Sequence, residues 1–239
     1  NLQHGSQVRG VSFNIRAGEV LGLTGLVGAG RTETARLLFG ADRPEHGVIR
    51  LDGKPLKIKS PRDAIRQGIC LLTEDRKTHG LVLGQTAREN FGLPNLSQFA
   101  SLGFIRQREE SREFLRYVDQ IQIKIADPEQ ITGTLSGGNQ QKVVLAKWLQ
   151  RNAEVILFDE PTRGIDVGAK YEIYQLINQL ATDGKAILMI SSELPEVLGM
   201  SDRILVMNEG RVTGEITDVA QATQEDIMNL ATSRETLAA

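Results

Sequence analysis

Five short apolar runs constrain the fold of this chain more than any other feature. Each run is bounded by turn residues, and segments with helical periodicity alternate with the runs. The runs are Val20–Thr24, Ile69–Thr73, Val155–Asp159, Ala186–Ile190 and Arg203–Met207. Strands that are apolar on both faces and alternate with helices typically form a parallel sheet that helices cover on both sides. Ligands of such sheets usually bind at the carboxyl ends of the strands.

Other segments predict elements outside that sheet. Val11, Phe13 and Ile15 alternate with polar residues, as in a half-exposed antiparallel strand, and Gly47–Gly53 resembles a second edge strand. The middle of the chain, about residues 86–149, has helical patterns and little strand character. We therefore expect an α/β core with a mostly parallel sheet, an antiparallel β edge and an inserted helical subdomain. The expected division is 1–85 and 150–239 for the two parts of the core, and 86–149 for the insertion.

Composition narrows the class of protein. The formal net charge is −2 and the pI is near 6.0, so we expect no bulk attraction to nucleic acid and no nucleic-acid partner. No apolar run approaches the roughly 18 residues of a membrane span, which predicts a soluble chain that reaches a membrane only through a partner. Cys70 is the single cysteine and lies in an apolar run; we expect a buried thiol, in keeping with a reducing cytoplasm.

A glycine-rich loop follows the first apolar run. It reads Gly25-Leu-Val-Gly28-Ala29-Gly30-Arg31-Thr32 and precedes a helical segment, the context in which backbone N–H groups and a helix N-terminus bind phosphate. Thr32 is a candidate Mg²⁺ ligand, but Arg31 stands where a phosphate loop has lysine. An arginine suits phosphate oxygens yet is bulkier than the compact ammonium. The alternative is a strand-to-helix turn without a ligand.

An acidic pair ends the run Val155–Asp159. Asp159 is a candidate for holding Mg²⁺, and Glu160 is a candidate for polarising an attacking water. An ordinary acidic pair at a strand end is the alternative. Its combination with a phosphate loop on another strand of the same core favours a nucleotide site.

A second possible anion site lies in the helical insertion. Ser136, Gly137 and Gly138 begin a long helical pattern, so one hydroxyl and several N–H groups stand at the positive end of a helix dipole. The alternative is a capped helix start, although two glycines serve capping poorly. We expect some other group to approach this backbone closely.

Together these motifs resemble the nucleotide-binding domain of ABC ATPases over essentially the whole chain. The segments "GLVGAGRTE", "TEDRKTHGLVLG", "LSGGNQQKVVLAKWL" and "DEPTRGIDVGAK" more narrowly resemble the carboxyl-terminal half of the two-domain ATP-binding subunits of carbohydrate importers. Members of that family import ribose, galactose, arabinose and related molecules. The usual linker and first half are absent from this chain, so it resembles an excised half.

The resemblance implies a P-loop NTPase (RecA-like) core that binds ATP with Mg²⁺ and functions as an ABC-type ATPase. Two halves would meet head to tail, so that ATP lies between the phosphate loop of one half and the signature motif of the other. In this chain that signature comprises Ser136, Gly137, Gly138 and Asn139. The implied partners are a second nucleotide-binding half, transmembrane permease subunits and a separate sugar-binding protein. The implied location is the cytoplasmic face of the membrane, where the half is held by the permease.

Three residues depart from the general family pattern. Arg31 replaces the phosphate-loop lysine, Glu74 occupies the usual glutamine position of the Q-loop, and Ser192 stands where a histidine usually contacts the γ-phosphate. A carboxylate at position 74 suits Mg²⁺ but repels phosphate, and a serine cannot carry charge. Glu160, the candidate base, is retained. We therefore predict weak or no hydrolysis at this half's own site, while its signature motif completes the competent site of the partner.

Several readings stay open. The resemblance implies that residues 75–85 contact the permease, whereas a plain surface loop is the alternative. His4 is a weak candidate for stacking on adenine, and Trp148 is better explained by core packing. The whole chain is alternatively a soluble ABC ATPase without a transport role, or a regulatory module that binds nucleotide without turnover. The sequence does not identify the sugar.

Overall fold

The structure is a computed structural model that describes residues 1–101, 103–151 and 153–233. Its contacts divide the chain into two compact units, which we describe separately. Unit 1 comprises residues 1–71, 154–160 and 177–239, and unit 2 comprises residues 72–153 and 161–176.

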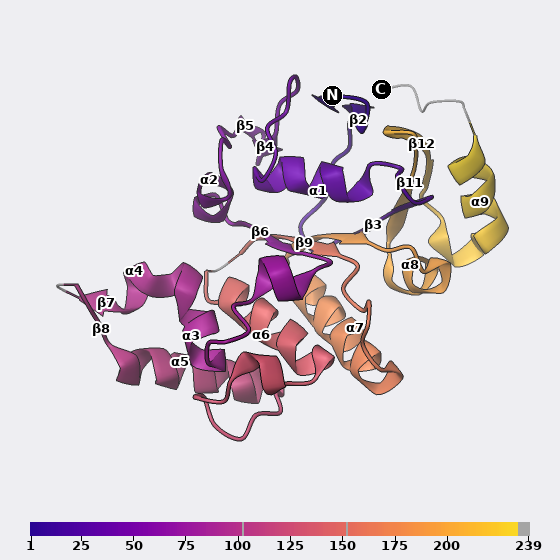
Figure 1. Ribbon diagram of the computed structural model, residues 1–239. Coiled ribbons are helices and arrows are strands. Elements are labelled where there is room, and N and C mark those ends of the chain that lie inside the picture. Colours follow the sequence, from indigo (N-terminus) through magenta and orange to yellow (C-terminus); the bar gives the residue numbers. More distant parts are fainter. Residues whose placement is uncertain (102, 152, 234–239) are drawn as a thin grey trace. The chain divides into compact units, whose positions relative to one another are not determined.

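Unit 1 is built around the predicted parallel sheet (Figure 1). The strand order is β12-β11-β3-β10-β9-β6. The strands are β3 (Val20–Gly25), β6 (Ile69–Leu72), β9 (Val155–Asp159), β10 (Ala186–Ile190), β11 (Arg203–Asn208) and β12 (Arg211–Ile216). All five predicted apolar strands are confirmed, and β3, β9, β10 and β11 pair in parallel. The sixth strand, β12, pairs with β11 in the antiparallel direction and was not predicted.

The predicted antiparallel strand through Phe13 and Ile15 is wrong in position. The antiparallel pair is β1 (Leu2–His4) with β2 (Val8–Val11), so the strand ends before Phe13. In the following segment side chains bind the backbone: Arg203 donates to the Asn14 carbonyl at 2.9 Å, and Arg16 N–H donates to Glu19 at 2.6 Å. The second predicted edge strand shrinks to β4 (Arg50–Leu51), which pairs with β5 (Lys54–Pro55) and not with the main sheet.

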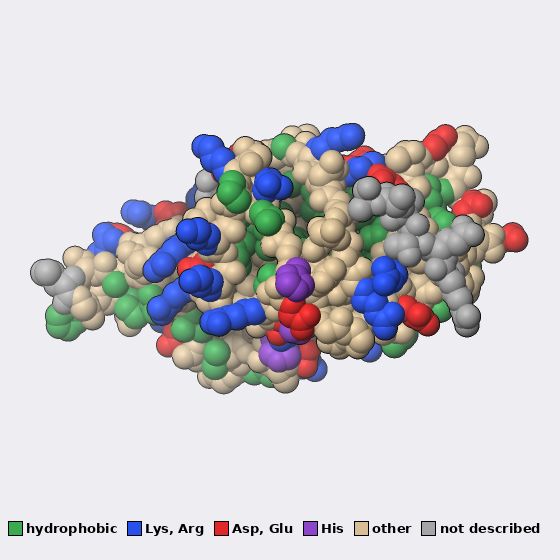
Figure 2. Space-filling view, turned by 90° about the horizontal axis from the view of Figure 1, so that it is seen from above, with side chains coloured by type: hydrophobic (Ala, Val, Ile, Leu, Met, Phe, Trp, Pro, Cys, Tyr) green, Lys and Arg blue, Asp and Glu red, His purple; other side chains and the backbone are tan. Residues whose placement is uncertain are grey.

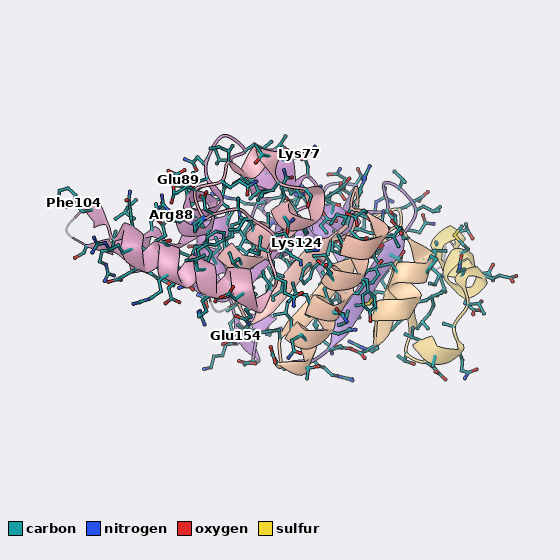
Figure 3. The ribbon with its side chains drawn as sticks, turned by 90° about the horizontal axis from the view of Figure 1, so that it is seen from below. Lys77, Arg88, Glu89, Phe104, Lys124 and Glu154 are labelled. Atoms are coloured by element: carbon teal, nitrogen blue, oxygen red, sulfur yellow. The ribbon has the colours of Figure 1, made fainter. Side chains whose placement is uncertain are left out.

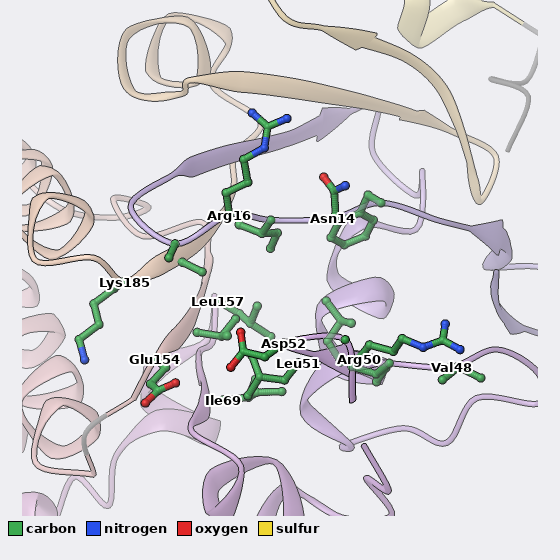
Figure 4. A pocket seen from close by; sticks show the side chains of 18 of the residues that line it. Asn14, Arg16, Val48, Arg50, Leu51, Asp52, Ile69, Glu154, Leu157 and Lys185 are labelled. Atoms are coloured by element: carbon green, nitrogen blue, oxygen red, sulfur yellow. The ribbon is translucent and has the colours of Figure 1, made fainter. Parts of the chain in front are cut away.

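These two irregular segments line a cavity of about 880 Å³ in unit 1 (Figure 4). The cavity also touches Ile69, Val155 and Ala186, the first residues of β6, β9 and β10. It therefore lies at the amino ends of the parallel strands, whereas ligands of such sheets bind at the carboxyl ends.

Four α-helices belong wholly to unit 1, namely α1 (Arg31–Phe39), α2 (Pro61–Arg66), α8 (Leu194–Met200) and α9 (Gln224–Thr232). A short 3₁₀ turn, η4, covers Val219–Gln221. Val197 of α8, Ile227 of α9 and Val206 of β11 belong to a fully buried apolar cluster that fixes α8 and α9 on the sheet. Cys70 in β6 is buried, as predicted.

Unit 2 is mostly helical. Its helices are α3 (Ala87–Gly92), α4 (Leu96–Phe99), α5 (Gln107–Gln120) and α6 (Gly137–Leu149), with a small hairpin of β7 (Ala100–Ser101) and β8 (Phe104–Ile105). Short π- and 3₁₀-helical turns cover Arg76–Gly80, Leu93–Asn95 and Thr132–Thr134. The helix α7 (Val167–Thr182) begins in unit 2 and ends in unit 1. Within the described residues, no helix has the length and apolarity required to cross a membrane.

Aromatic packing and one buried charge cluster stabilise unit 2. The ring of Phe91 packs against Phe114 and Tyr117 of α5, with centroids 5.3 and 5.6 Å apart. Beside them the buried guanidinium of Arg88 forms ion pairs with Glu110 and Glu129, and Figure 3 shows Arg88 next to α5. Trp148 is only 8% exposed, which confirms its predicted role in packing.

Candidate functional site

The glycine-rich loop joins the end of β3 to the start of α1. Gly25, Gly28 and Gly30 all have positive φ, at 148°, 80° and 96°, a region that residues with a Cβ rarely adopt. No described side chain caps the first turn of α1 at Gly30. The N-terminal N–H groups of this helix are therefore available to an anion, as the phosphate-loop prediction requires. The Ala29 carbonyl accepts from Gly210 N–H at 3.0 Å, which holds the loop in place.

Thr32, in the first turn of α1, meets Asp159, the last residue of β9. The Thr32 hydroxyl donates to Asp159 Oδ1 at 3.2 Å, and Asp159 is only 2% exposed. Burial raises the pKa of the Asp159 carboxyl to about 6, against an ordinary value of 3.8. A hydroxyl and a carboxylate are hard oxygen donors, the type that Mg²⁺ prefers, so the donor set fits this metal.

Glu160 is held between two of the residues that depart from the family pattern. Its carboxylate lies 3.5 Å from Arg31 Nη1, and both side chains are about a tenth exposed. The Ser192 hydroxyl donates to the other carboxylate oxygen at 3.1 Å. The backbone of Glu160 has φ 50°, which is unusual for a non-glycine residue, and its N–H donates to Ile190 O at 3.0 Å. The structure thus brings Arg31, Glu160 and Ser192 together.

The contact between Arg31 and Glu160 has no hydrogen bond. Arg31 Nη1 is buried and has no hydrogen-bond partner among the residues that the structure describes. A buried guanidinium nitrogen without a partner is costly, because it has lost its water without gaining an acceptor. A phosphate oxygen in the adjoining loop would supply such an acceptor.

Glu74 lies in unit 2, where it forms an ion pair with Arg163. Sequence reasoning predicted Glu74 as a nucleotide or Mg²⁺ contact and did not single out Arg163. A carboxylate alone would repel phosphate. The guanidinium of Arg163 offsets the negative charge of Glu74 and so weakens that repulsion. Arg163 lies within the motif "DEPTRGID", and the sequence alone gives this cation no evident partner.

The signature motif begins the helix α6. Ser136 is its N-cap, and the hydroxyl accepts from the Asn139 N–H at 3.4 Å and from the Asn139 amide at 3.0 Å. The Asn139 amide oxygen in turn accepts from Lys124 N–H at 2.8 Å. Ser136 remains exposed to solvent. These contacts fix the direction of the hydroxyl at the positive end of α6.

Gly137 and Gly138 allow close approaches from within unit 2. A Cβ at position 137 would lie 2.7 Å from Arg76 Nη2, and one at position 138 would lie 2.8 Å from the Cβ of Ala169 in α7. Both distances are shorter than real Cβ contacts. The close approach expected at these glycines is therefore made by Arg76 and by α7.

Arg76 connects the start of α6 to the loop that follows Glu160. Its Nη1 donates to the Arg163 carbonyl at 3.2 Å and its Nε donates to the Gln140 amide oxygen at 3.4 Å. Arg76 is 9% exposed, and burial lowers the pKa of its guanidinium. The predicted permease strip, residues 75–85, is therefore not uniformly on the surface, because Arg76 and Leu81 are buried while Lys77, His79 and Val82 are exposed.

The adenine contact stays a prediction. His4 is half-buried, and its Nδ1 lies 3.1 Å from the Arg43 carbonyl oxygen. This contact orients the ring in unit 1 but does not identify a base-binding role.

A family model described as "ABC transporter" matches residues 8–163. A putative ribose/galactose/methyl galactoside import ATP-binding protein of Rhizobium etli is 56% identical over 232 residues, covering 97% of this chain and 44% of the relative. A ribose import ATP-binding protein of Oceanobacillus iheyensis is 54% identical over 222 residues, covering 93% of this chain and 45% of the relative. The chain therefore spans about half the length of the curated relatives it matches.

Solved structures support the fold. A nucleotide-free ATP-binding cassette from an ABC transporter has a TM-score of 0.78 at 22% identity, covering 95% of this chain and 90% of that one. A dimeric ATP-binding cassette bound to ADP and Pi has a TM-score of 0.73 at 24% identity, covering 87% of this chain and 89% of that one. These likenesses confirm the predicted α/β fold with its mostly parallel sheet.

Proposed function

This chain belongs to the ABC transporter family, and on that basis we propose that it is one ATP-binding half of the ATPase subunit of an importer for a sugar or sugar-like solute. The observation that carries the proposal is the convergence in unit 1 of the phosphate loop with Thr32, Asp159, Glu160 and Ser192. The names of the relatives support the solute class, because one is named as a putative ribose/galactose/methyl galactoside import ATP-binding protein and another as a ribose import ATP-binding protein.

Each of these site residues has a distinct proposed role. The N–H groups of residues 25–32 would bind the phosphates of ATP, with Arg31 donating to a phosphate oxygen. Thr32 and Asp159 would hold Mg²⁺, which supplies positive charge to the β- and γ-phosphates. Glu160 would accept the proton of the attacking water, and Ser192 would hold the Glu160 carboxylate in position.

We propose further that hydrolysis at this site is slow. The support is the ion pair between Arg31 and Glu160, since a carboxylate that contacts a guanidinium must leave it before accepting a proton from water. Ser192 adds a neutral donor where a histidine would add charge. The site would therefore hold nucleotide for longer than it turns it over.

The signature motif would serve the other half of the subunit. Ser136 and the N–H groups of Gly137, Gly138 and Asn139 lie at the positive end of α6, where they suit the γ-phosphate of a nucleotide bound by the partner. The dimeric cassette among the similar structures supports a second half. Glu74 would then act through its ion pair with Arg163 and not as a direct ligand of Mg²⁺.

The remaining partners follow from the importer role. Permease subunits would hold this half at the cytoplasmic face of the membrane, and a separate sugar-binding protein would deliver the solute. We expect the intact ATPase subunit, purified from solubilised membranes through a tag, to retain a polytopic membrane protein. Recovery of the subunit without one would contradict the importer role and favour a regulatory nucleotide-binding module.

Replacing Arg31 with lysine tests why the site is slow. In Arg31→Lys the shorter ammonium no longer reaches Glu160 as the guanidinium does, but Ser192 remains, so phosphate release should rise by less than about tenfold. The measurement is steady-state phosphate release with Mg-ATP, with Glu160→Gln as the background. A rise to an ordinary enzyme rate would show that Arg31 alone limits the site.

A further inference from the structure

Unit 1 carries an exposed basic segment that the nucleotide site does not use. Its side chains are those of Arg50, Lys54, Lys57, Lys59, Arg62 and Arg66, which we call the basic strip; all six are exposed. Residues 50–66 contain these six cations and only two carboxylates, a local charge of +4 in a chain whose net charge is −2. The rest of the chain therefore carries −6, so charge is strongly segregated.

Local structure presents the strip to solvent. After β5, Leu56 and Ile58 turn inward while Lys57 and Lys59 are exposed, because side chains alternate along an extended segment. Ile58 packs closely against Gly40 at the end of α1 and anchors the segment there. A Cβ added at Gly40 would lie only 2.5 Å from Ile58 Cγ2. In α2 the buried residue is Ala64.

Arg62 and Arg66 stand four residues apart in α2 and therefore share one face of the helix. Figure 2 looks onto the side of the molecule that carries β4, β5 and α2 in Figure 1, and it shows several Lys and Arg side chains close together on this face.

Among the described residues the strip has no close carboxylate partner, although Asp63 attracts Arg66 at longer range. Within the part of the chain that the structure describes, none of the six cations forms an ion pair within 4.0 Å. Asp63 accepts from Ser60 Oγ at 2.9 Å and from Lys59 N–H at 3.1 Å, and the bond from Ser60 lowers the pKa of its carboxyl. The negative charge of Asp63 is thus bound to the start of α2.

The arginines of α5 and its N-cap provide a contrast. Arg106 pairs with Glu109, and both Arg112 and Arg116 pair with Glu113. Three of the four arginines in this run are therefore paired with glutamates; Arg108 is the one for which the described residues show no ion pair. The basic strip has no such pairs among the described residues, and it gathers six cations within residues 50–66, so its charge is available to an external anionic partner.

The composition of the strip favours a diffuse array of negative charge. Residues 50–66 contain no aromatic side chain, so they offer no stacking platform of the kind that binds single-stranded nucleic acid. Lysine and arginine on long, flexible stems suit a field of phosphate headgroups, and a cluster of four to eight of them is typical of segments that bind anionic lipid.

We propose that the basic strip is a contact surface for anionic phospholipid headgroups of the membrane that holds the permease. The proposal rests on the importer role for its location, but it concerns a surface separate from the nucleotide site. Charge on this one face would orient unit 1 toward the bilayer and supplement the contact with the permease. Each cation near an anionic membrane strengthens binding by about fivefold at low salt.

The test measures co-sedimentation of the chain with vesicles. One set contains equal parts of phosphatidylglycerol and phosphatidylcholine, and the other contains phosphatidylcholine alone. The strip variant combines Lys57→Gln, Lys59→Gln, Arg62→Gln and Arg66→Gln. The matched control combines Arg106→Gln, Arg108→Gln, Arg112→Gln and Arg116→Gln, which removes the same charge from the region of α5.

We expect the unmodified chain to bind the phosphatidylglycerol vesicles and not the neutral ones, with binding that falls as salt rises. The strip variant should bind at least about tenfold more weakly, and the control should stay within about twofold of the unmodified chain. Equal loss in both variants, or equal binding to both vesicle types, would overturn the proposal. Tighter binding of the strip to a DNA or RNA oligonucleotide than to the vesicles would also overturn it.

ATP binding by the same proteins separates this proposal from the proposed function. The strip variant should bind ATP as the unmodified chain does, which shows that it is folded. If no variant binds ATP but the strip still determines vesicle binding, the nucleotide proposal fails and the lipid surface stands.

Discussion

Replacing Gly137 with alanine is expected to abolish ATP turnover in the assembled importer. The new methyl group would lie 2.7 Å from Arg76 Nη2 and 3.2 Å from the Gly164 carbonyl. The guanidinium is held by the Arg163 carbonyl and by Gln140, so we expect the start of α6 to move instead. The N–H groups proposed for the partner's γ-phosphate would then move with the start of α6. Removing one well-placed donor from a developing negative charge typically lowers turnover by about 10²–10³-fold.

The same variant should leave nucleotide binding by the isolated chain unchanged, because Gly137 lies in unit 2 and the phosphate loop lies in unit 1. Gly199→Ala is the control: Gly199 is also helical, it is exposed, and a Cβ there meets no described atom within 4 Å. Ordinary turnover in Gly137→Ala would show that Arg76 swings aside freely and that the signature backbone is not held as we describe.

Replacing Asp159 with asparagine is expected to stabilise the metal-free chain. The folded carboxyl has a pKa of about 6 against an ordinary 3.8 because it is buried. A raised pKa of an acid means that ionisation disfavours the folded state. The penalty is absent below about pH 4 and fully present above about pH 6, where it is on the order of 2–3 kcal/mol.

Denaturant unfolding of Asp159→Asn at several pH values measures this effect. The gain in the free energy of unfolding should be largest at pH 7–8 and should shrink toward pH 4. Mg²⁺-dependent ATP binding should fall at the same time, by about 10–100-fold. A stability gain that does not depend on pH would contradict a penalty from the ionised carboxylate.

The central strands could be predicted because their sequences carry one strong signal. β9 and β10 are apolar at nearly every position and follow helical segments, so burial on both faces explains them without knowledge of the rest of the chain. The segment after β2 shows the limit of this reasoning. Phe13 and Ile15 alternate in burial with their neighbours, as in a strand. However, the backbone of this segment bonds to side chains and not to a strand partner: the Asn14 carbonyl accepts from Arg203, which is distant in the sequence, and the Arg16 N–H donates to Glu19, which is close.

Motifs in the sequence indicated which candidate residues to compare, but not the contacts that these residues make. Motif spacing located Thr32, Asp159 and Glu160, and the structure brings all three into unit 1 with Arg31. No local pattern indicates that Arg31 contacts Glu160, because the two are far apart in the sequence. The roles of Arg76 and Arg163 were missed for the same reason: their partners lie on other segments, and only packing identifies them.

The most direct test of the account is steady-state phosphate release by the isolated chain with Mg-ATP, measured beside ATP binding and with Glu160→Gln as the background. We expect the chain to bind ATP and to release phosphate no faster than Glu160→Gln. That result would fit a site in which Arg31 and Ser192 hold the Glu160 carboxylate. Binding followed by release at an ordinary enzyme rate, lost in Glu160→Gln, would contradict the account.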